Sequence, residues 1–320
     1  MSWPRPWKRF LRPRRTRTLV TMGLGAGIRY GHGAGVLAIA HRGGAGLAPE
    51  NTMDAFARSY ALGLRYLETD VRLTADGVLL AFHDARVNRV TDGRGAIGKK
   101  TYAEVQRLRI SGRHEIPTLA GSLQAFPDAF FSIDLKEERA IGHLAQELVQ
   151  TGAAHRVCVS GARGSWLRKL RDQVGPELTT SLCWRDLATL VARTHARLGL
   201  PSGRDRGTFA HVPLEVGRFP VYGNRLIAQA SAHDISIIVW TVNEPDQMHR
   251  LLDAGVAGII TDRPDLLREV LIARDQWTTP AERIGEPEPP ALERPGCPSW
   301  MRARVPACST PGARCCAVLP

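Results

Sequence analysis

The sequence contains no apolar run long enough to cross a lipid bilayer, which takes about 20 residues. The apolar stretch near the N-terminus, residues 18–28, is short and rich in glycine, and Arg29 and His32 follow it at once. The six cysteines show no C-x-x-C spacing, and four of them crowd the C-terminus without a partnering histidine. Neither a zinc site nor a disulfide framework for the body of the protein is therefore indicated.

The body of the chain also carries little net charge. Of the formal charge of +12, seven basic residues lie within residues 1–17 and three within residues 296–320, and neither segment contains an acid, so +2 remains for everything between them. A protein that binds nucleic acid presents a strong positive field, so we expect no nucleic-acid partner. Trp3, Trp7 and Phe10 lie among the N-terminal arginines, a composition suited to weak contact with anionic membrane.

These shifts in composition predict three parts: a basic, glycine-rich flexible arm over residues 1–35, one folded domain over residues 36–272, and a Pro-, Arg- and Cys-rich disordered tail over residues 273–320. The arm has no clean cleavage site, so we expect a cytoplasmic protein. Membrane association, export and a true start at Met22 are the alternatives.

Short β-type runs alternate with helical stretches through the folded part, which is typical of parallel βα units. One helix is predicted over residues 52–62, where apolar residues recur every three or four positions, with Asn51 or Thr52 as the N-cap and Gly63 beyond the end. Eight strands are predicted at residues 36–40, 66–71, 130–135, 157–160, 178–182, 209–213, 235–241 and 258–261.

A ninth run, residues 78–83, follows the second strand after only a short loop that contains Asp76-Gly77, a hairpin-turn pair. A parallel crossover needs a dozen or more residues, so this run must return antiparallel, as a β-hairpin excursion. The eight remaining strands predict an α/β fold, a closed (β/α)8 TIM barrel. An open doubly wound sheet is the alternative, but the glycine-rich segment 23–35 precedes the first strand instead of following it, unlike a nucleotide-binding loop.

Charged residues and histidines gather where the predicted strands end. His41-Arg42 follows the first strand, and His83 ends the antiparallel run. The second strand ends with Glu68 and Asp70, and the third with Asp134 and Lys136. In a barrel of this kind the carboxyl ends of the strands meet at one mouth. Three carboxylates there would repel one another unless a cation neutralised them, and oxygen ligands favour Mg²⁺ or Ca²⁺ over zinc.

This set of residues fits the hydrolysis of a phosphodiester. The metal and Arg42 would hold the non-bridging oxygens, and Lys136 would face the developing negative charge. His41 and His83 would act as general acid and general base, with the assignment of the two roles left open. Of the other histidines, His211 in the sixth strand is the best placed for a role in the pocket.

The segments AHRGGAGLAPENT, LETDVRLTADGVLLAFHD, NRVTDGRG, FSIDLK, VWTVN and GVAGIITDRPDLL together resemble the glycerophosphodiester phosphodiesterase family, in the same order and over roughly residues 38–267. The resemblance implies a TIM barrel that uses a divalent cation to hydrolyse glycerophosphodiesters to an alcohol and sn-glycerol 3-phosphate. It assigns acid/base catalysis to His41 and His83, metal binding to Glu68, Asp70 and Asp134, and substrate binding to Arg42, Lys136, Trp240 and Asn243. Asp134 stands where many members carry Glu.

Two alternative functions remain open. A lysophospholipase D-type hydrolase would accept a diester that bears an acyl chain, and the lining of the mouth, for example Leu47 and Trp240, fits either activity. A non-catalytic protein that binds membranes through its basic arms is a further alternative, which the small charge of the body disfavours.

Overall fold

The computed structural model describes residues 28–32, 35–199, 207–216, 219–220 and 223–277. Most of the predicted arm and tail lies outside these residues, and so do Met22 and the N-terminal aromatics. Tyr30, at the end of the predicted arm, is buried against Tyr66, Phe130 and Phe209. No helix in the described part of the chain is long and apolar enough to cross a membrane.

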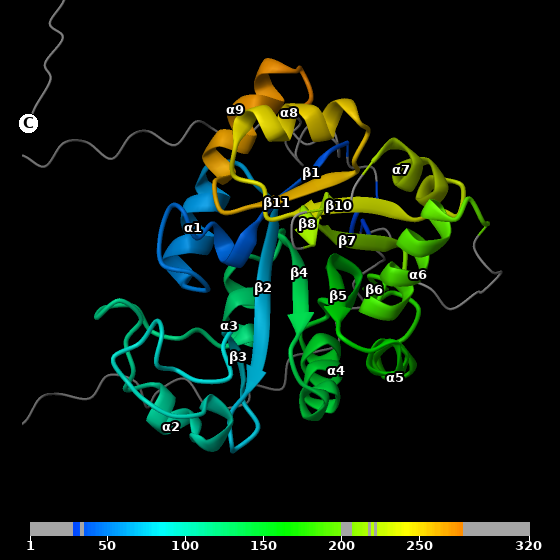
Figure 1. Ribbon diagram of the computed structural model, residues 1–320. Coiled ribbons are helices and arrows are strands. Elements are labelled where there is room, and N and C mark those ends of the chain that lie inside the picture. The colour runs from blue at the N-terminus through cyan, green and yellow to red at the C-terminus, as the bar shows by residue number, and fades with distance from the viewer. Residues whose placement is uncertain (1–27, 33–34, 200–206, 217–218, 221–222, 278–320) are drawn as a thin grey trace, which may run out of the picture.

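The fold is the predicted (β/α)8 barrel (Figure 1). Its strands, in spatial order, are β6 (Thr179–Thr180), β5 (Val157–Gly161), β4 (Phe130–Leu135), β2 (Tyr66–Leu73), β1 (Leu37–Ala40), β11 (Gly258–Thr261), β10 (Ser236–Trp240) and β7 (Phe209–Pro213). All seven neighbouring pairs in this order are parallel. A bridge between Ser181 and Phe209 joins the two ends of the sheet, so the barrel closes.

Alternation along the strands separates two layers of the core. Leu37 and Ile39 of β1 and Tyr66 of β2 belong to the inner cluster that fills the barrel, whereas Ala38 and Leu67 belong to the outer cluster beneath the helices. Because successive side chains point to opposite faces of a strand, Glu68 and Asp70 lie on the same inner side as Tyr66, farther toward the carboxyl end. This alternation directs two carboxylates into the mouth of the barrel.

Helices α1 (Met53–Ala61), α3 (Leu119–Ala125), α4 (Ile141–Gln150), α5 (Gly164–Val174), α6 (Trp184–His195), α7 (Asn224–Ser231), α8 (Pro245–Asp253) and α9 (Pro264–Ala273) surround the strands (Figure 1). The prediction for α1 is confirmed: the Thr52 side chain accepts a hydrogen bond from the Ala55 N–H, and Gly63 follows the helix with φ +93°. Two short strands, β8 (Glu215–Val216) and β9 (Phe219–Pro220), pair with each other after β7.

The excursion after β2 is confirmed and is larger than a hairpin. Strand β3 (Leu79–Ala81) pairs antiparallel with β2. The chain beyond it forms a lobe with its own apolar cluster, in which Phe82, Val87 and Ile97 are buried, and with the short helix α2 (Tyr102–Val105). In Figure 1 this lobe projects to one side of the barrel at the lower left. The lobe carries His83 to the barrel mouth from outside the ring of strands.

Candidate active site

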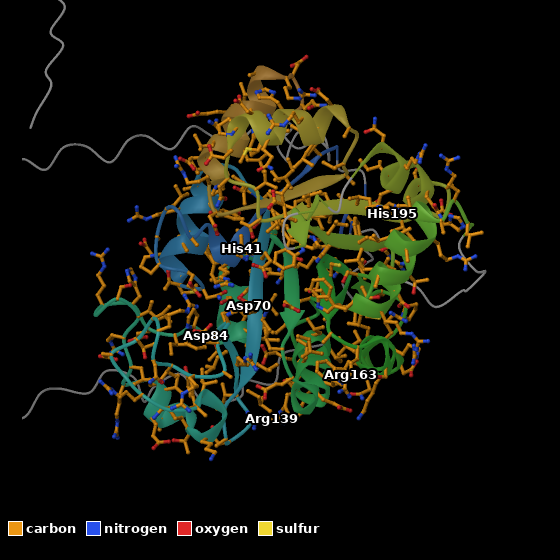
Figure 2. All side chains as sticks on the ribbon, viewed as in Figure 1. His41, Asp70, Asp84, Arg139, Arg163 and His195 are labelled. Atoms are coloured by element: carbon orange, nitrogen blue, oxygen red, sulfur yellow. The ribbon has the colours of Figure 1, made fainter. Side chains whose placement is uncertain are left out.

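A cavity of about 230 Å³ opens at the carboxyl ends of the barrel strands. Eight of the nine side chains predicted for the site line it: His41, Arg42, Glu68, Asp70, His83, Asp134, Lys136 and Trp240. Figure 2 labels His41 and Asp70 of this site and Asp84 of the lobe to their left, whereas Arg163 and His195 are labelled at the right of the view. Residues that lie up to 199 positions apart in the sequence therefore share one pocket, as the strand-end pattern predicts.

Glu68 and Asp70 form a buried acidic pair at the end of β2. Burial, and then the charge of Asp70, raise the pKa of Glu68 to about 7. The Glu68 carboxylate accepts a hydrogen bond of 2.7 Å from the backbone N–H of Arg42, which has a left-handed conformation with φ 49°. Because burial is the larger cause, the raised pKa shows first that the Glu68 carboxylate is poorly solvated, and the charge of Asp70 adds to this effect.

Lys136 lies between two of the predicted metal ligands. Its Nζ is 2.8 Å from Asp70 Oδ1 and 2.5 Å from Asp134 Oδ2. Burial opposes ionisation of Asp70, but the nearby Lys136 charge outweighs burial and holds the pKa of Asp70 below its ordinary value. Asp134 also accepts a hydrogen bond from the Ser160 hydroxyl at 3.3 Å. Asp134 is therefore paired with a lysine in this arrangement.

The expected cage of three carboxylates is not formed in this arrangement. Within the described ranges, no group of three His, Cys, Asp or Glu side chains converges closely enough to hold a metal ion. The physical reason is the Lys136 ammonium, which pairs with Asp134 and Asp70. Glu68 and Asp70 still fit a divalent cation, because both are buried oxygen donors that line the cavity from the same face of β2.

His41 is held by a carboxylate that the sequence analysis did not identify. Its Nδ1 lies 2.7 Å from Oδ1 of Asp262, 221 positions away in the sequence, just after β11. Burial lowers the pKa of the His41 imidazole, but the hydrogen bond to Asp262 and the charge of Glu68 outweigh it, and the pKa lies above its ordinary value. With Nδ1 bonded to Asp262, Nε2 is the nitrogen of His41 left for a reaction.

Asn243, the ninth predicted residue, does not line the cavity among the described residues. Its Nδ2 donates to Asp262 Oδ2 at 2.9 Å, and its Oδ1 accepts from the Asp262 backbone N–H at 2.9 Å. The amide thus fixes the carboxylate that holds His41. Its assignment to substrate binding remains a prediction.

His83 is oriented in the same way by its neighbour in the chain. Its Nδ1 lies 2.7 Å from Asp84 Oδ1, and its backbone carbonyl accepts a hydrogen bond of 3.0 Å from Arg72 Nε. His41 and His83 therefore each have a carboxylate on Nδ1. Such a partner fixes the orientation of the imidazole ring.

Arg42 is positioned to contact a ligand. Its NH1 donates to Glu50 Oε1 at 2.8 Å, and its buried Nε makes no hydrogen bond, although Asp70 Oδ2 lies 3.5 Å away. The guanidinium therefore lies between the carboxylates of Glu50 and Asp70 and lines the cavity. Its contact with a phosphate stays a prediction.

The other wall of the cavity consists mainly of apolar and uncharged polar side chains from the later strands and from α6. Burial lowers the pKa of His211 to about 4, and its buried Nε2 has no hydrogen-bond partner, so this imidazole is neutral. Trp184 is 52% exposed and packs edge-on against Trp240 at 6.3 Å between ring centroids. The remaining members of this wall are Ser132, Ser160, Gly161, Ser181, Leu182, Leu187 and Ile260.

Comparison with known proteins agrees with this geometry. The family model described as "Glycerophosphoryl diester phosphodiesterase family" matches residues 41–266. Glycerophosphodiester phosphodiesterase 2 of Mycobacterium tuberculosis is 37% identical over 77% of this chain and 94% of its own. The chain belongs to the glycerophosphoryl diester phosphodiesterase family.

Two further matches are a curated relative and a solved structure. A lysophospholipase D of Mus musculus is 25% identical over 79% of this chain and 85% of its own. The solved structure of an Oleispira antarctica phosphodiesterase in complex with the product sn-glycerol-3-phosphate covers 73% of this chain and 96% of its own, with a TM-score of 0.59 and 21% identity. The second likeness shows the shared fold. Phosphodiesterases of this family generally depend on a divalent cation.

Proposed function

We propose that the protein hydrolyses glycerophosphodiesters to sn-glycerol 3-phosphate and an alcohol, with His41 and His83 as the proton-transfer pair and with Mg²⁺ or Ca²⁺ as cofactor. One observation carries the proposal. Two imidazoles, each bonded through Nδ1 to a carboxylate at 2.7 Å, line the same cavity as Arg42 and Lys136. Membership of the family supports the reaction class.

The charged residues divide into binding and proton transfer. The guanidinium of Arg42 binds a phosphate oxygen, and Lys136, which pairs with the same Asp70 carboxylate as Arg42, supplies a second positive charge on the same side of the cavity. Glu68 and Asp70 would hold the cation, with Asp134 as a third ligand once Lys136 turns from it to the phosphate. When bound, the cation supplies positive charge against the phosphate oxygens in the transition state.

The two histidines then transfer protons in opposite directions, one accepting and one donating. One imidazole takes a proton from the attacking water through Nε2 while a bond forms between the water oxygen and phosphorus. The other gives its Nε2 proton to the alcohol oxygen as the bond from phosphorus to that oxygen breaks. We assign the donor role to His41, because Asp262 and Glu68 raise its pKa and favour the protonated ring, and the acceptor role to His83.

A leaving-group experiment tests this assignment. p-Nitrophenolate leaves without a proton, so His41→Ala loses far less activity on a p-nitrophenyl diester of glycerol phosphate than on glycerophosphocholine. His83→Ala loses activity on both substrates, because water still needs a base. An equal loss on both substrates for His41→Ala would contradict the donor role.

Chelation tests the metal. EDTA is expected to abolish release of glycerol 3-phosphate from glycerophosphocholine, and Mg²⁺ or Ca²⁺ added in excess of EDTA is expected to restore it. Direct binding of the ion, measured by calorimetry on the wild type and on Glu68→Gln, provides a readout that does not depend on turnover. Full activity in EDTA would remove the cation from the proposal.

A lysophospholipase D-type activity is the second candidate, because an apolar wall adjoins the charged one. Trp184, Leu182 and Leu187 line the cavity, and Trp184 is half exposed at its mouth. Such a surface suits a diester whose glycerol carries an acyl chain, and the mouse relative is named a lysophospholipase D.

A substrate comparison separates the two candidates. If acyl-bearing substrates use the apolar wall, Trp184→Ser lowers turnover of lysophosphatidylcholine much more than that of glycerophosphocholine. Val149→Ser is the matched control, because Val149 is 59% exposed on α4 and does not line the cavity. No turnover of lysophosphatidylcholine by the wild type would exclude the second candidate.

A further inference from the structure

Arg89, in the lobe, binds two carboxylates with one guanidinium. Its NH1 and NH2 donate to the two carboxylate oxygens of Glu50 at 2.7 and 2.6 Å. Its Nε and NH2 donate to Asp84 Oδ2 and Oδ1 at 2.7 and 3.1 Å. Both contacts are bidentate, a geometry that the planar guanidinium provides and an ammonium does not.

Each of these carboxylates also holds a residue of the cavity. Glu50 accepts the 2.8 Å hydrogen bond from Arg42, and Asp84 holds His83 at 2.7 Å. The residues thus form a continuous chain of hydrogen bonds, which we call the Arg89 bridge: Arg42, Glu50, Arg89, Asp84 and His83. Within the described part of the protein, its three central members do not line the cavity.

The bridge spans two parts of the fold. Arg42 and Glu50 belong to the segment between β1 and α1 of the barrel, whereas His83, Asp84 and Arg89 belong to the lobe. Arg42 comes from the barrel and His83 from the lobe, and proper alignment of both on one phosphate requires the two parts to keep a fixed distance. On either side of His83 and Asp84 in the sequence, Phe82 and Val87 are buried in the apolar cluster of the lobe.

Stability is a weak explanation for this arrangement. The Arg89 side chain is 48% exposed, and exposed ion pairs contribute little to the free energy of folding because water screens them. Orientation is a stronger one, since a displacement of about 1 Å in a reacting group costs roughly 100-fold in rate. The charges also fit: Glu50 lies between the guanidinium groups of Arg42 and Arg89, and Asp84 accepts from Arg89 and faces the His83 imidazole. Both pKa values lie below their ordinary range, for Glu50 because Arg89 and Arg42 outweigh its burial and for Asp84 because of Arg89.

We infer that Arg89 is a positioning residue that aligns the phosphate-binding Arg42 with the proton-transferring His83 across the junction of barrel and lobe. The inference rests on the proposed function for the roles of those two residues. Arg89 touches neither the substrate nor the cation; it acts through Glu50 on one side and Asp84 on the other.

The primary test compares Arg89→Gln and Arg89→Lys with Arg58→Gln. Arg58 is an exposed arginine of α1 that pairs with Asp54, so it is a matched control for the loss of a surface ion pair. We expect Arg89→Gln to lower kcat/KM for glycerophosphocholine by about 10- to 100-fold. Arg89→Lys is expected to stay impaired, because one ammonium cannot make two bidentate contacts. Arg58→Gln keeps wild-type activity.

Two readouts distinguish positioning from general destabilisation. Glu50→Gln acts through the substrate-binding Arg42 and is expected mainly to raise KM. Asp84→Asn acts through His83 and is expected mainly to lower kcat. Arg89→Gln is expected to do both. Methylguanidine in the assay is expected to restore part of the activity of Arg89→Gln at the half-exposed site and to leave Arg58→Gln unchanged. A purely structural residue would show neither the split nor the rescue.

A second set of variants keeps the inference testable if Arg89→Gln does not fold. Glu50 and Asp84 are joined only through Arg89, so the Glu50→Gln, Asp84→Asn double variant should retain more activity than the product of the two single losses predicts. Losses that multiply independently, full activity of Arg89→Lys, or a change in Arg89→Gln below twofold would overturn the inference. If His41→Ala retains activity, the proposed function fails instead, whatever the Arg89 variants do.

Discussion

Replacing Asp262 with Asn removes one charge and leaves the side chain the same size. Asp262 accepts hydrogen bonds on both oxygens, from His41 Nδ1 at 2.7 Å and from Asn243 Nδ2 at 2.9 Å. An asparagine has one acceptor and one donor, so it satisfies only one of these neighbours. If its NH₂ faces His41, Nδ1 must become the acceptor, and the proton moves to Nε2 in the neutral ring.

The magnitude follows from these contacts. A hydrogen bond to a charged group contributes about 1.5–3 kcal/mol, and each 1.36 kcal/mol changes a rate tenfold, so the loss of orientation alone predicts roughly 10- to 150-fold. A ring held in the wrong tautomer loses more, up to about 10⁴-fold in the best-known carboxylate–histidine pair. We expect kcat for glycerophosphocholine to fall by about 10²–10⁴-fold.

The pH dependence of kcat/KM should also change in Asp262→Asn, in a defined direction. Asp262 raises the pKa of His41, so its removal lowers that pKa. A proton donor is active only below its pKa, and the alkaline limb of the kcat/KM profile should therefore move to lower pH in Asp262→Asn. Asp253→Asn is the control, because Asp253 is 67% exposed and bonds only Arg274. A loss in Asp262→Asn below tenfold, with an unmoved alkaline limb, would refute the role given to Asp262.

Two further predictions concern stability. In EDTA, the free energy of unfolding of the wild type should fall as the pH rises from about 5 to 8. The pKa of Glu68 is about 7 in the folded protein, whereas an ordinary glutamate has a pKa of 4.5. The native state therefore holds a proton that the unfolded chain has lost. Glu68→Gln should reduce that slope in urea titrations, and Glu147, whose pKa burial also raises to about 7, supplies the remainder. An unchanged slope would refute the contribution of Glu68. Arg156 is buried and donates to the carbonyls of Leu123, Phe126 and Ala129 at the end of α3. Arg156→Met leaves these acceptors unpaired and should cost about 2–4 kcal/mol of unfolding free energy, measured by urea denaturation, whereas a change below 0.5 kcal/mol would mean that water replaces the guanidinium.

The fold was predictable because its signal is local. Parallel strands read as short apolar runs, and three of the eight predicted strands, for example Phe130–Leu135, have the predicted bounds. The fifth predicted strand shows what such a run does not determine: a strand is predicted over residues 178–182, but only Thr179–Thr180 pair with β5. There the barrel closes through a single bridge.

The site was predictable where a residue stands next to a strand end, as for Glu68 and Asp70. Contacts between residues that only tertiary packing brings together could not be predicted. Asp262 lies 221 positions from His41, and nothing in the spacing of either residue indicates the other. Trp184 belongs to the cavity because α6 begins beside β10, a placement that only the closed barrel produces.

The position of Lys136 is the clearest difference from expectation. Counting acidic residues at strand ends predicts a metal cage of Glu68, Asp70 and Asp134. The same count also places a lysine two residues beyond Asp134, and its ammonium competes with a cation for the same oxygens. Composition alone does not decide between an ion pair and a metal site when both charges are local.

The central claim is that two imidazoles transfer protons at one phosphate, and substitution of each tests it most directly. Release of glycerol 3-phosphate from glycerophosphocholine should be measured for His41→Ala, His83→Ala and His195→Ala, the last an exposed histidine of α6 outside the cavity (Figure 2). The account predicts losses of roughly 10²–10⁴-fold for His41→Ala and His83→Ala, and wild-type turnover for His195→Ala. Losses below tenfold for both cavity histidines would contradict it.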